Sequence, residues 1–400
     1  MIRGLLLCLL SGTLVFSLGA SFASPIPQAS QGDRLGEAFY VPPSPLPRAP
    51  HGYVIRSRPL TGAAVLEGAA LNTLVLYHTT LADGTDVAVS GAVAIPKGNP
   101  PGGGWPIVSW AHGTTGNAPE CAPTRLDEPD YEQKYLDAWV KHGYAVLQTD
   151  YEGQGTPGLH PYLVGVAAAH DVTDIVRAAR RLYPALGTRW FVLGHSEGGS
   201  AALFTAVVAP GWAPELQLLG AVSFAPPAKI ASLFKSIPEM KEATPILPFL
   251  LEMIEGIASV DPSIKLSKLL TPEASERLPL LQQKCTAEMF ADDAWLSLPP
   301  SQIFREHANT RPLYYDFVAN EDDRLHFTIP LLLLQGDADG IVSPALTTTL
   351  DYELCASHTP VTYDELPDKT HTTIVTQTFD GAASWVDAVA SGKPPAPNCS

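Results

Sequence analysis

The sequence predicts an α/β fold, in which a mostly parallel sheet is flanked by helices and a long helical insertion forms a cap. Three observations lead to this prediction. Short apolar runs alternate with segments of helical periodicity, a pattern typical of parallel sheets. The pentapeptide Gly194-His195-Ser196-Glu197-Gly198 joins an apolar run to an Ala-rich helical stretch. About 100 residues separate two of the predicted strands, far more than an ordinary crossover needs.

The amino terminus has the pattern of a secretory signal peptide. Arg3 supplies a positive charge, residues 5–18 are mostly apolar, and cleavage between Ala23 and Ser24 would remove residues 1–23. No later run approaches the length of a membrane helix. Residues 24–51 are rich in proline with little periodicity, which favours an extended arm. We therefore expect a secreted chain, extracellular or periplasmic.

The core is expected in two parts, residues 52–225 and 329–400, with the cap at residues 226–328 between them. Helices are expected at residues 166–182, where apolar side chains recur at helical spacing, and at 345–356. The expected strands are apolar runs bounded by turn residues, namely residues 74–80, 86–95, 106–111, 144–149, 190–193, 218–224, 329–334 and 361–366.

Charge and cysteines narrow the class of protein. The net charge of −16 argues against a nucleic-acid or anionic-membrane partner, because either would need a basic face. Four cysteines follow the signal peptide, so two disulfides are expected and three connectivities are open. We favour Cys121 with Cys285, which would tie the core to the cap, and Cys355 with Cys399, which would pin the tail. No Cys-x-x-Cys pair occurs, and we expect neither a metal nor a cofactor.

Ser196 is the candidate nucleophile. A serine on a sharp turn between a buried strand and a helix presents its hydroxyl above the sheet, and glycines two residues before and after it let the two elements approach closely. Residues 190–193 fit that strand, and no helix breaker occurs from Glu197 until Pro210. The alternative is a Gly-rich turn with an inert serine. The arrangement favours acyl transfer by Ser196.

A serine needs a histidine base, and the histidine needs a carboxylate that orients it. In this kind of fold the acid and then the histidine follow the serine along the chain. The acid is expected in the loop after the strand at 329–334, where we favour Asp339 over Asp337. His371 is the favoured base because it lies in a loop past a strand, whereas His358 ends a predicted helix and suits its dipole.

The reaction also needs two N–H donors for the oxyanion of its tetrahedral intermediate. One is expected from the backbone of Glu197, and the other from the turn after the strand at 106–111. We assign the second donor to Thr114, with Thr115 as the near alternative. His112 is interpreted as a brace of that loop and His195 as structural.

One cap segment, residues 246–257, is very apolar and is interrupted only by Glu252 and Glu255. It is either a lid or tunnel that receives an acyl chain, or an ordinary buried cap helix. Both interpretations require the same residues, so the sequence leaves them open.

Taken together, the chain resembles the secretory lipase family of α/β-hydrolases, which includes fungal type-A lipases and many bacterial secreted lipases and esterases. The resemblance runs from about Gly52 to Cys399. It implies hydrolysis of carboxylic esters, including acylglycerols, by Ser196, Asp339 and His371 without a cofactor, and it implies the two disulfides favoured above. In addition to the cap, the resemblance rests on His112-Gly113-Thr114-Thr115-Gly116, Asp150-Tyr151-Glu152-Gly153, Gly194-His195-Ser196-Glu197-Gly198, Gly336-Asp337-Ala338-Asp339 and His371.

We therefore expect a secreted serine ester hydrolase, a lipase or carboxylesterase that works through an acyl-enzyme. Its partner would be an ester or lipid, including one at a lipid–water interface, and the chain is expected to be a monomer. A peptidase or amidase of the same fold is the first alternative, and an inactive hydrolase-like binding module is the second. A lidless polyester hydrolase is disfavoured by the cap.

Overall fold

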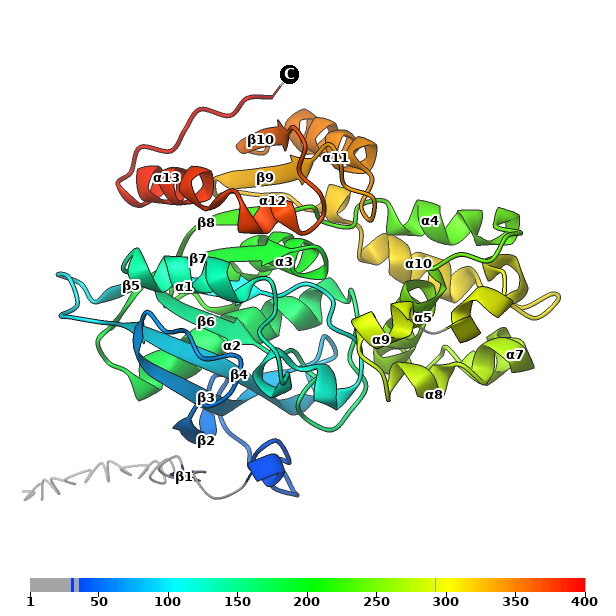
Figure 1. Cartoon of the computed structure of the whole chain (residues 1–400), viewed down its shortest axis with the longest axis horizontal. Helices are drawn as coiled ribbons and strands as arrows, with labels where there is room; N and C mark the ends of the chain where they lie inside the picture. Colours follow the sequence, from blue (N-terminus) through cyan, green and yellow to red (C-terminus); the bar gives the residue numbers. More distant parts are fainter. Residues whose placement is uncertain (1–29, 32–35, 292, 400) are drawn as a thin grey trace, which may run out of the picture.

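The computed structural model describes residues 30–31, 36–291 and 293–399. The predicted signal peptide lies outside these residues. Within them the structure has one ten-stranded sheet, in the order β1-β2-β3-β4-β6-β5-β7-β8-β9-β10 (Figure 1). The strands are β1 Ser30–Gln31, β2 Val54–Pro59, β3 Ala69–Thr80, β4 Asp86–Pro96, β5 Trp105–Ala111, β6 Ala145–Thr149, β7 Leu186–His195, β8 Gln217–Phe224, β9 Leu331–Gly336 and β10 Val361–Leu366.

The sheet is parallel over its larger part. Neighbouring strands from β6 through β5, β7, β8 and β9 to β10 are all parallel, with Val108 of β5 paired to Val146 of β6 and Phe191 of β7. β2, β3 and β4 form an antiparallel edge, and β4 is antiparallel to β6. The predicted fold class, a mostly parallel sheet flanked by helices, is confirmed.

All eight predicted strands occur; β10 has the predicted ends, and the other strands have shifted ends. β3 starts earlier than predicted, and β7 runs from Leu186 to His195, up to the residue before Ser196. β2 was not predicted, because its sequence VIRSRP carries two arginines and its residues are mostly half-buried. Such a strand near a sheet edge lacks the apolar run that marks a buried strand.

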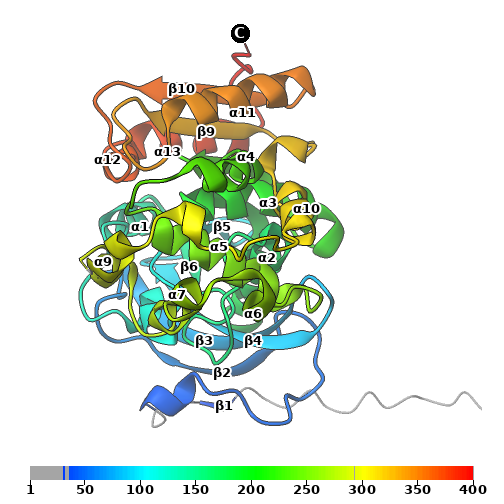
Figure 2. The same cartoon turned by 90° about the vertical axis from the view of Figure 1, so that its right-hand side faces the viewer.

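Helices cover both faces of the sheet (Figure 2). One buried cluster packs α2, α3 and α11 against one face, and a second packs α1, α12 and α13 against the other. α3 runs two residues past Pro210, because a proline removes only one N–H and the helix ends within that turn. These helices are α1 Gln133–Lys141, α2 Gly165–Leu182, α3 Glu197–Trp212, α11 Pro344–Ala356, α12 Thr373–Thr376 and α13 Phe379–Ala390.

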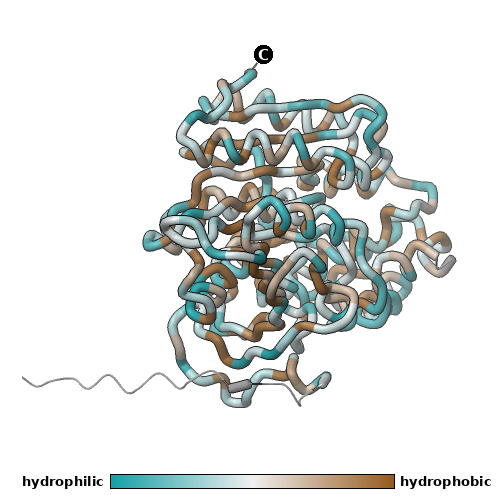
Figure 3. Tube along the Cα trace, turned by 60° about the vertical axis from the view of Figure 1, so that its left-hand side comes forward, coloured by the Kyte–Doolittle hydropathy of each residue, from teal (hydrophilic) through white to brown (hydrophobic). Residues whose placement is uncertain are grey.

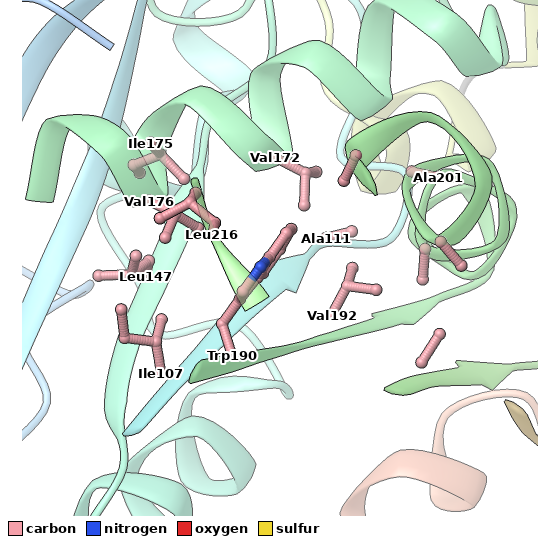
Figure 4. Packing of buried hydrophobic residues seen from close by; sticks show 14 of the residues in the cluster. Ile107, Ala111, Leu147, Val172, Ile175, Val176, Trp190, Val192, Ala201 and Leu216 are labelled. Carbon is pink, nitrogen blue, oxygen red and sulfur yellow. The ribbon is translucent and has the colours of Figure 1, made fainter. Parts of the chain in front are cut away.

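Trp190 of β7 anchors the first of these faces. Its side chain is fully buried, and it points from the sheet toward Val172 and Val176 of α2 (Figure 4). Ala201 of α3 lies in the same layer. Truncating a buried tryptophan typically costs about 3–5 kcal/mol of stability. This packing fixes α2 and α3 on the strand that leads to Ser196.

The long insertion between β8 and β9 is helical and groups beyond one end of the strands (Figure 1). It has a buried cluster of its own, which includes Phe234, Ile254 and Phe317. The apolar side chains of α5 pack in the core of the cap, and both interpretations of this segment stay predictions. The elements are α4 Ile230–Ser236, η4 Ile237–Glu239, α5 Leu247–Val260, α6 Leu266–Leu269, α7 Pro272–Ser275, α8 Leu278–Leu281, α9 Thr286–Phe290, η5 Asp293–Ser297, η6 Pro300–Gln302, α10 Arg311–Ala319 and η7 Asp322–Arg324.

The Pro-rich segment differs from the predicted extended arm. Residues Gly36–Phe39 form the short helix η1, and Phe39 and Tyr40 are buried against Leu74 and Leu76 of β3. Burial of these two aromatic side chains holds this part of the arm on the sheet. The many prolines around them hide this tendency in the sequence. In Figure 3 hydrophobic stretches gather in the interior of the chain, while many outer loops are hydrophilic.

Two disulfides join Cys121 to Cys285 and Cys355 to Cys399. This is the pairing favoured from the sequence. The first ties a loop of the core to the cap, and the second holds the carboxyl-terminal tail on α11. Among the described residues, no helix has the length and apolar character needed to cross a membrane.

Candidate active site

The candidate residues lie at the carboxyl ends of neighbouring parallel strands. The turn His112 to Gly116 follows β5, Ser196 follows β7, Asp339 follows β9 and His371 follows β10. Because the carboxyl ends of parallel strands meet at one edge of a sheet, loops from distant parts of the sequence come together there. The cap lies over this edge (Figures 1 and 2).

Ser196 occupies a strained turn between β7 and α3. Its φ of 55° and ψ of −120° lie in a region that non-glycine residues rarely adopt and that typically costs about 1–3 kcal/mol. The turn is held because Ser196 N donates to Phe224 O at 2.8 Å and Ser196 O accepts from Gly199 N at 2.8 Å. A Cβ at Gly194 would overlap the Gly198 carbonyl. The close approach of strand and helix therefore requires glycine on both sides of the serine.

Asp339 orients His371. Its buried carboxylate accepts from His371 Nδ1 at 2.8 Å and from the backbone N–H groups of Ile341 at 2.8 Å and Val342 at 2.9 Å. Burial alone would raise the pKa of the Asp339 carboxyl, but the hydrogen bonds and the charge of His371, with the two N–H groups, lower it below its ordinary value. The carboxylate stays ionised and can only accept, so the Nδ1 of His371 carries a hydrogen.

His371 lies beside the residue that precedes the serine. The rings of His195 and His371 are 4.5 Å apart between centroids. Within the described part of the chain, the Ser196 hydroxyl makes no hydrogen bond to His371. Since catalytic hydrogen bonds often form only with bound substrate, the roles of Ser196 and His371 stay predictions here.

Three backbone N–H groups of the candidate oxyanion donors make no hydrogen bond among the described residues. Among the described residues, the N–H groups of Glu197 and Thr114 donate to no acceptor, and the same holds for Thr115. His112 Nδ1 donates to Gly113 O at 2.8 Å. Because a trans peptide points its N–H opposite to its carbonyl, this bond fixes the direction of the Thr114 N–H. His112 thus braces the loop, and the choice between Thr114 and Thr115 stays open.

The turn His112 to Gly116, called the oxyanion turn after its predicted role, is also attached to the cap. Thr286 N donates to Thr115 O at 2.9 Å, and the Thr286 hydroxyl donates to Thr114 O at 3.3 Å. Thr286 follows Cys285, which is bonded to Cys121 a few residues past the turn. At this point the cap is fastened to the turn.

A buried polar layer supports α3 from below the cap. Glu197 Oε1 pairs with His160 Nε2 at 2.7 Å, and His160 Nδ1 donates to Glu152 O at 2.9 Å. Tyr151, with a positive φ of 62°, donates its hydroxyl to His112 O at 3.2 Å. The Asp150-Tyr151-Glu152-Gly153 motif therefore connects the residue after the serine to the oxyanion turn.

The alternative residues lie elsewhere. Asp337 Oδ1 accepts from Asp368 N at 2.7 Å, a bond between two loops rather than to the histidine. His358 is exposed in the turn after α11, before β10 begins. It therefore sits at the opposite edge of the sheet from Ser196.

Sequence reasoning missed several polar residues that brace this site, above all Glu132, Tyr131 and Thr286. None belongs to a recognisable motif, and each acts through a contact that only the folded chain creates. In the described part of the chain, no group of three or more His, Cys, Asp or Glu side chains is arranged to hold a metal ion.

Comparison with known proteins identifies related chains. The family model described as Secretory lipase matches residues 128–398. The chain is 27% identical over 215 residues to the "Probable inactive lipase MT1628" of Mycobacterium tuberculosis (strain CDC 1551 / Oshkosh), covering 50% of this chain and 47% of that protein. It is 26% identical over 243 residues to Lipase A of Moesziomyces aphidis, covering 57% and 50%. These matches span about half the length of each relative.

The solved structures include a similar fold. Candida antarctica lipase A superposes with a TM-score of 0.75 at 20% sequence identity, covering 90% of this chain and 87% of that chain. At this identity the likeness concerns the fold alone, which is that of the α/β-hydrolases.

Proposed function

Since the chain belongs to the secretory lipase family, we propose that it is a secreted serine carboxylic-ester hydrolase that works through an acyl-enzyme on Ser196. The observation that carries the proposal is the hydrogen bond from His371 Nδ1 to the buried Asp339 carboxylate, at the sheet edge where Ser196 occupies its strained turn. A histidine oriented by a carboxylate, together with a serine exposed on a sharp turn, is the arrangement that serine acylation needs. The family model is described as Secretory lipase, which supports a carboxylic ester as the substrate class.

In the proposed reaction, Ser196 Oγ attacks the ester carbonyl carbon while its proton passes to His371 Nε2. Asp339 holds the imidazolium that forms, and the N–H groups of Glu197 and of Thr114 or Thr115 receive the oxyanion. Collapse of the intermediate breaks the ester C–O bond, and the leaving alcohol takes the proton from His371. Water then attacks the acyl-enzyme with the same proton transfers, which releases the carboxylic acid and restores Ser196.

The relative named as an inactive lipase makes a direct activity test necessary. We would measure initial hydrolysis rates on p-nitrophenyl esters from acetate to palmitate, with Ser196→Ala as the blank. His371→Ala and His358→Ala form a matched pair, because only the first removes the histidine that Asp339 orients. We expect Ser196-dependent turnover, its loss in His371→Ala and its retention in His358→Ala.

The chain-length profile then identifies the ester class. Rates that persist to palmitate indicate a lipase, and a collapse beyond butyrate indicates a short-chain esterase. The absence of Ser196-dependent turnover on every ester would contradict the proposal and would turn attention to amides, and then to an inactive hydrolase fold.

A further inference from the structure

A buried carboxylate, Glu132, holds the oxyanion turn from the start of α1. It is fully enclosed at the start of α1. Its Oε1 accepts from Gly113 N at 3.0 Å, and its Oε2 accepts from Trp110 Nε1 at 2.6 Å. Glu132 thereby links the last residues of β5 to the first peptide of the turn that carries Thr114.

Tyr131 connects this carboxylate to the nucleophile elbow. Its hydroxyl lies 3.1 Å from Glu132 Oε1 and 2.6 Å from His195 Nδ1. The rings of Tyr131 and His195 also meet edge to face, with centroids 5.7 Å apart. One hydroxyl therefore bridges an acid on α1 and the last residue of β7.

His195 transmits this link to the candidate base. Its ring packs against that of His371 at a centroid distance of 4.5 Å. Burial, and then the charge of His371, lowers the pKa of His195 well below its ordinary value, so His195 stays neutral. His371 is thus held between the Asp339 carboxylate, which bonds Nδ1, and an uncharged ring that is itself fixed by Tyr131.

The backbone at Gly113 gives an independent sign that these groups meet at one point. A Cβ at Gly113 would lie 2.9 Å from the Tyr131 hydroxyl, 3.1 Å from His195 Nδ1 and 3.4 Å from Glu132 Oε1. The three polar groups converge on the turn closely enough to leave no room for a side chain.

We propose that Tyr131 is a positioning residue for the reaction: its hydroxyl ties His195, which packs on His371, to Glu132, which holds the oxyanion turn. The inference rests on the proposed function. The Tyr131 bridge, defined as Tyr131 with Glu132 and His195, holds the base and the oxyanion donors in a fixed position relative to each other. Both must be in place together only when the tetrahedral intermediate forms, so the bridge acts on turnover rather than on substrate binding.

The test replaces Tyr131 with phenylalanine, which removes the hydroxyl and keeps the ring. Active sites are counted by titration with a p-nitrophenyl phosphonate, and kcat and KM are measured per titrated site on the best ester of the wild-type series. We expect kcat to fall about tenfold with KM within about twofold of wild type, because one buried hydrogen-bonded bridge is lost.

Tyr144→Phe is the matched control. It also removes a tyrosine hydroxyl, here with its hydrogen bond to Asp387 at 3.1 Å, but it lies before β6 at the far edge of the sheet. Its kcat per site should equal that of wild type. If Tyr131→Phe behaves like this control, or if it lowers only the number of titratable sites, Tyr131 has a structural role and the inference is wrong.

A double-mutant cycle with His195→Leu tests the route of the effect. In the His195→Leu background, Tyr131→Phe should change kcat by less than about twofold, because the bridge is already broken. Fully multiplicative losses would show that Tyr131 does not act through His195. If the wild-type protein shows no turnover that depends on Ser196, the proposed function itself fails, an outcome distinct from a wild-type kcat in Tyr131→Phe.

Discussion

The Cys121–Cys285 disulfide is expected to serve activity as well as stability. The double substitution Cys121→Ala with Cys285→Ala opens a loop of 164 residues, for which chain entropy gives a loss of about 5 kcal/mol. The same change releases the segment that places Thr286 against the carbonyls of Thr114 and Thr115. We therefore expect both the free energy of unfolding and kcat to fall.

The second disulfide provides a matched control. Cys355→Ala with Cys399→Ala opens a loop of 44 residues, worth about 4 kcal/mol by the same relation, and its bond pins the tail rather than the oxyanion turn. Urea unfolding would measure stability for both variants, and kcat per titrated site would be measured where both are folded. We expect both to lose stability and only the Cys121/Cys285 variant to lose turnover, by about tenfold.

A wild-type kcat in the Cys121/Cys285 variant would refute the reasoning, because it would mean that the cap anchor does not position the oxyanion donors. A loss of kcat in the Cys355/Cys399 variant of the same size would also refute it, since the effect would then follow stability alone.

Two further predictions concern carboxylates. Asp339→Asn should lower kcat by about 10⁴, because an amide no longer selects the required tautomer of His371. Asp337 makes no bond to the histidine, so the kcat of Asp337→Asn should stay near that of wild type. Steady-state kinetics would compare the two variants, and similar rates would contradict the assignment. Asp322 accepts from Ser200 at 2.8 Å, and burial raises its pKa from 3.8 to about 8. Between these values the unfolded chain releases a proton that the native state keeps, so this group lowers stability as pH rises. Asp322→Asn should therefore gain stability relative to wild type from pH 5 to pH 7, by up to about 1.4 kcal/mol per pH unit, and a constant difference in urea unfolding would contradict this sign.

The sequence predicts the elements and residues that depend on local pattern. Apolar runs of four or more residues mark the inner strands, and the polar residues past their ends indicate Ser196, Asp339 and His371. The structure brings His371 and Asp339 together because β9 and β10 are parallel neighbours whose carboxyl ends meet. The catalytic roles of these residues stay predictions.

What the sequence could not predict depends on contacts made only by the folded chain. β2 carries two arginines and resembles a loop, and Phe39 lies among prolines that resemble a free arm. Glu132 and Thr286 are ordinary surface residues by type, and their importance comes from the backbone groups of the oxyanion turn that they reach. Such contacts between distant residues leave no periodic pattern in the sequence.

The most direct test of the central claim is covalent labelling of the nucleophile. The protein would be treated with a p-nitrophenyl alkylphosphonate, and the adduct would be located by intact mass and peptide mapping while esterase activity is followed. We predict one adduct per chain on Ser196, loss of activity in proportion to labelling, and no adduct in Ser196→Ala. Labelling of another residue, or full activity after Ser196 is modified, would contradict the account.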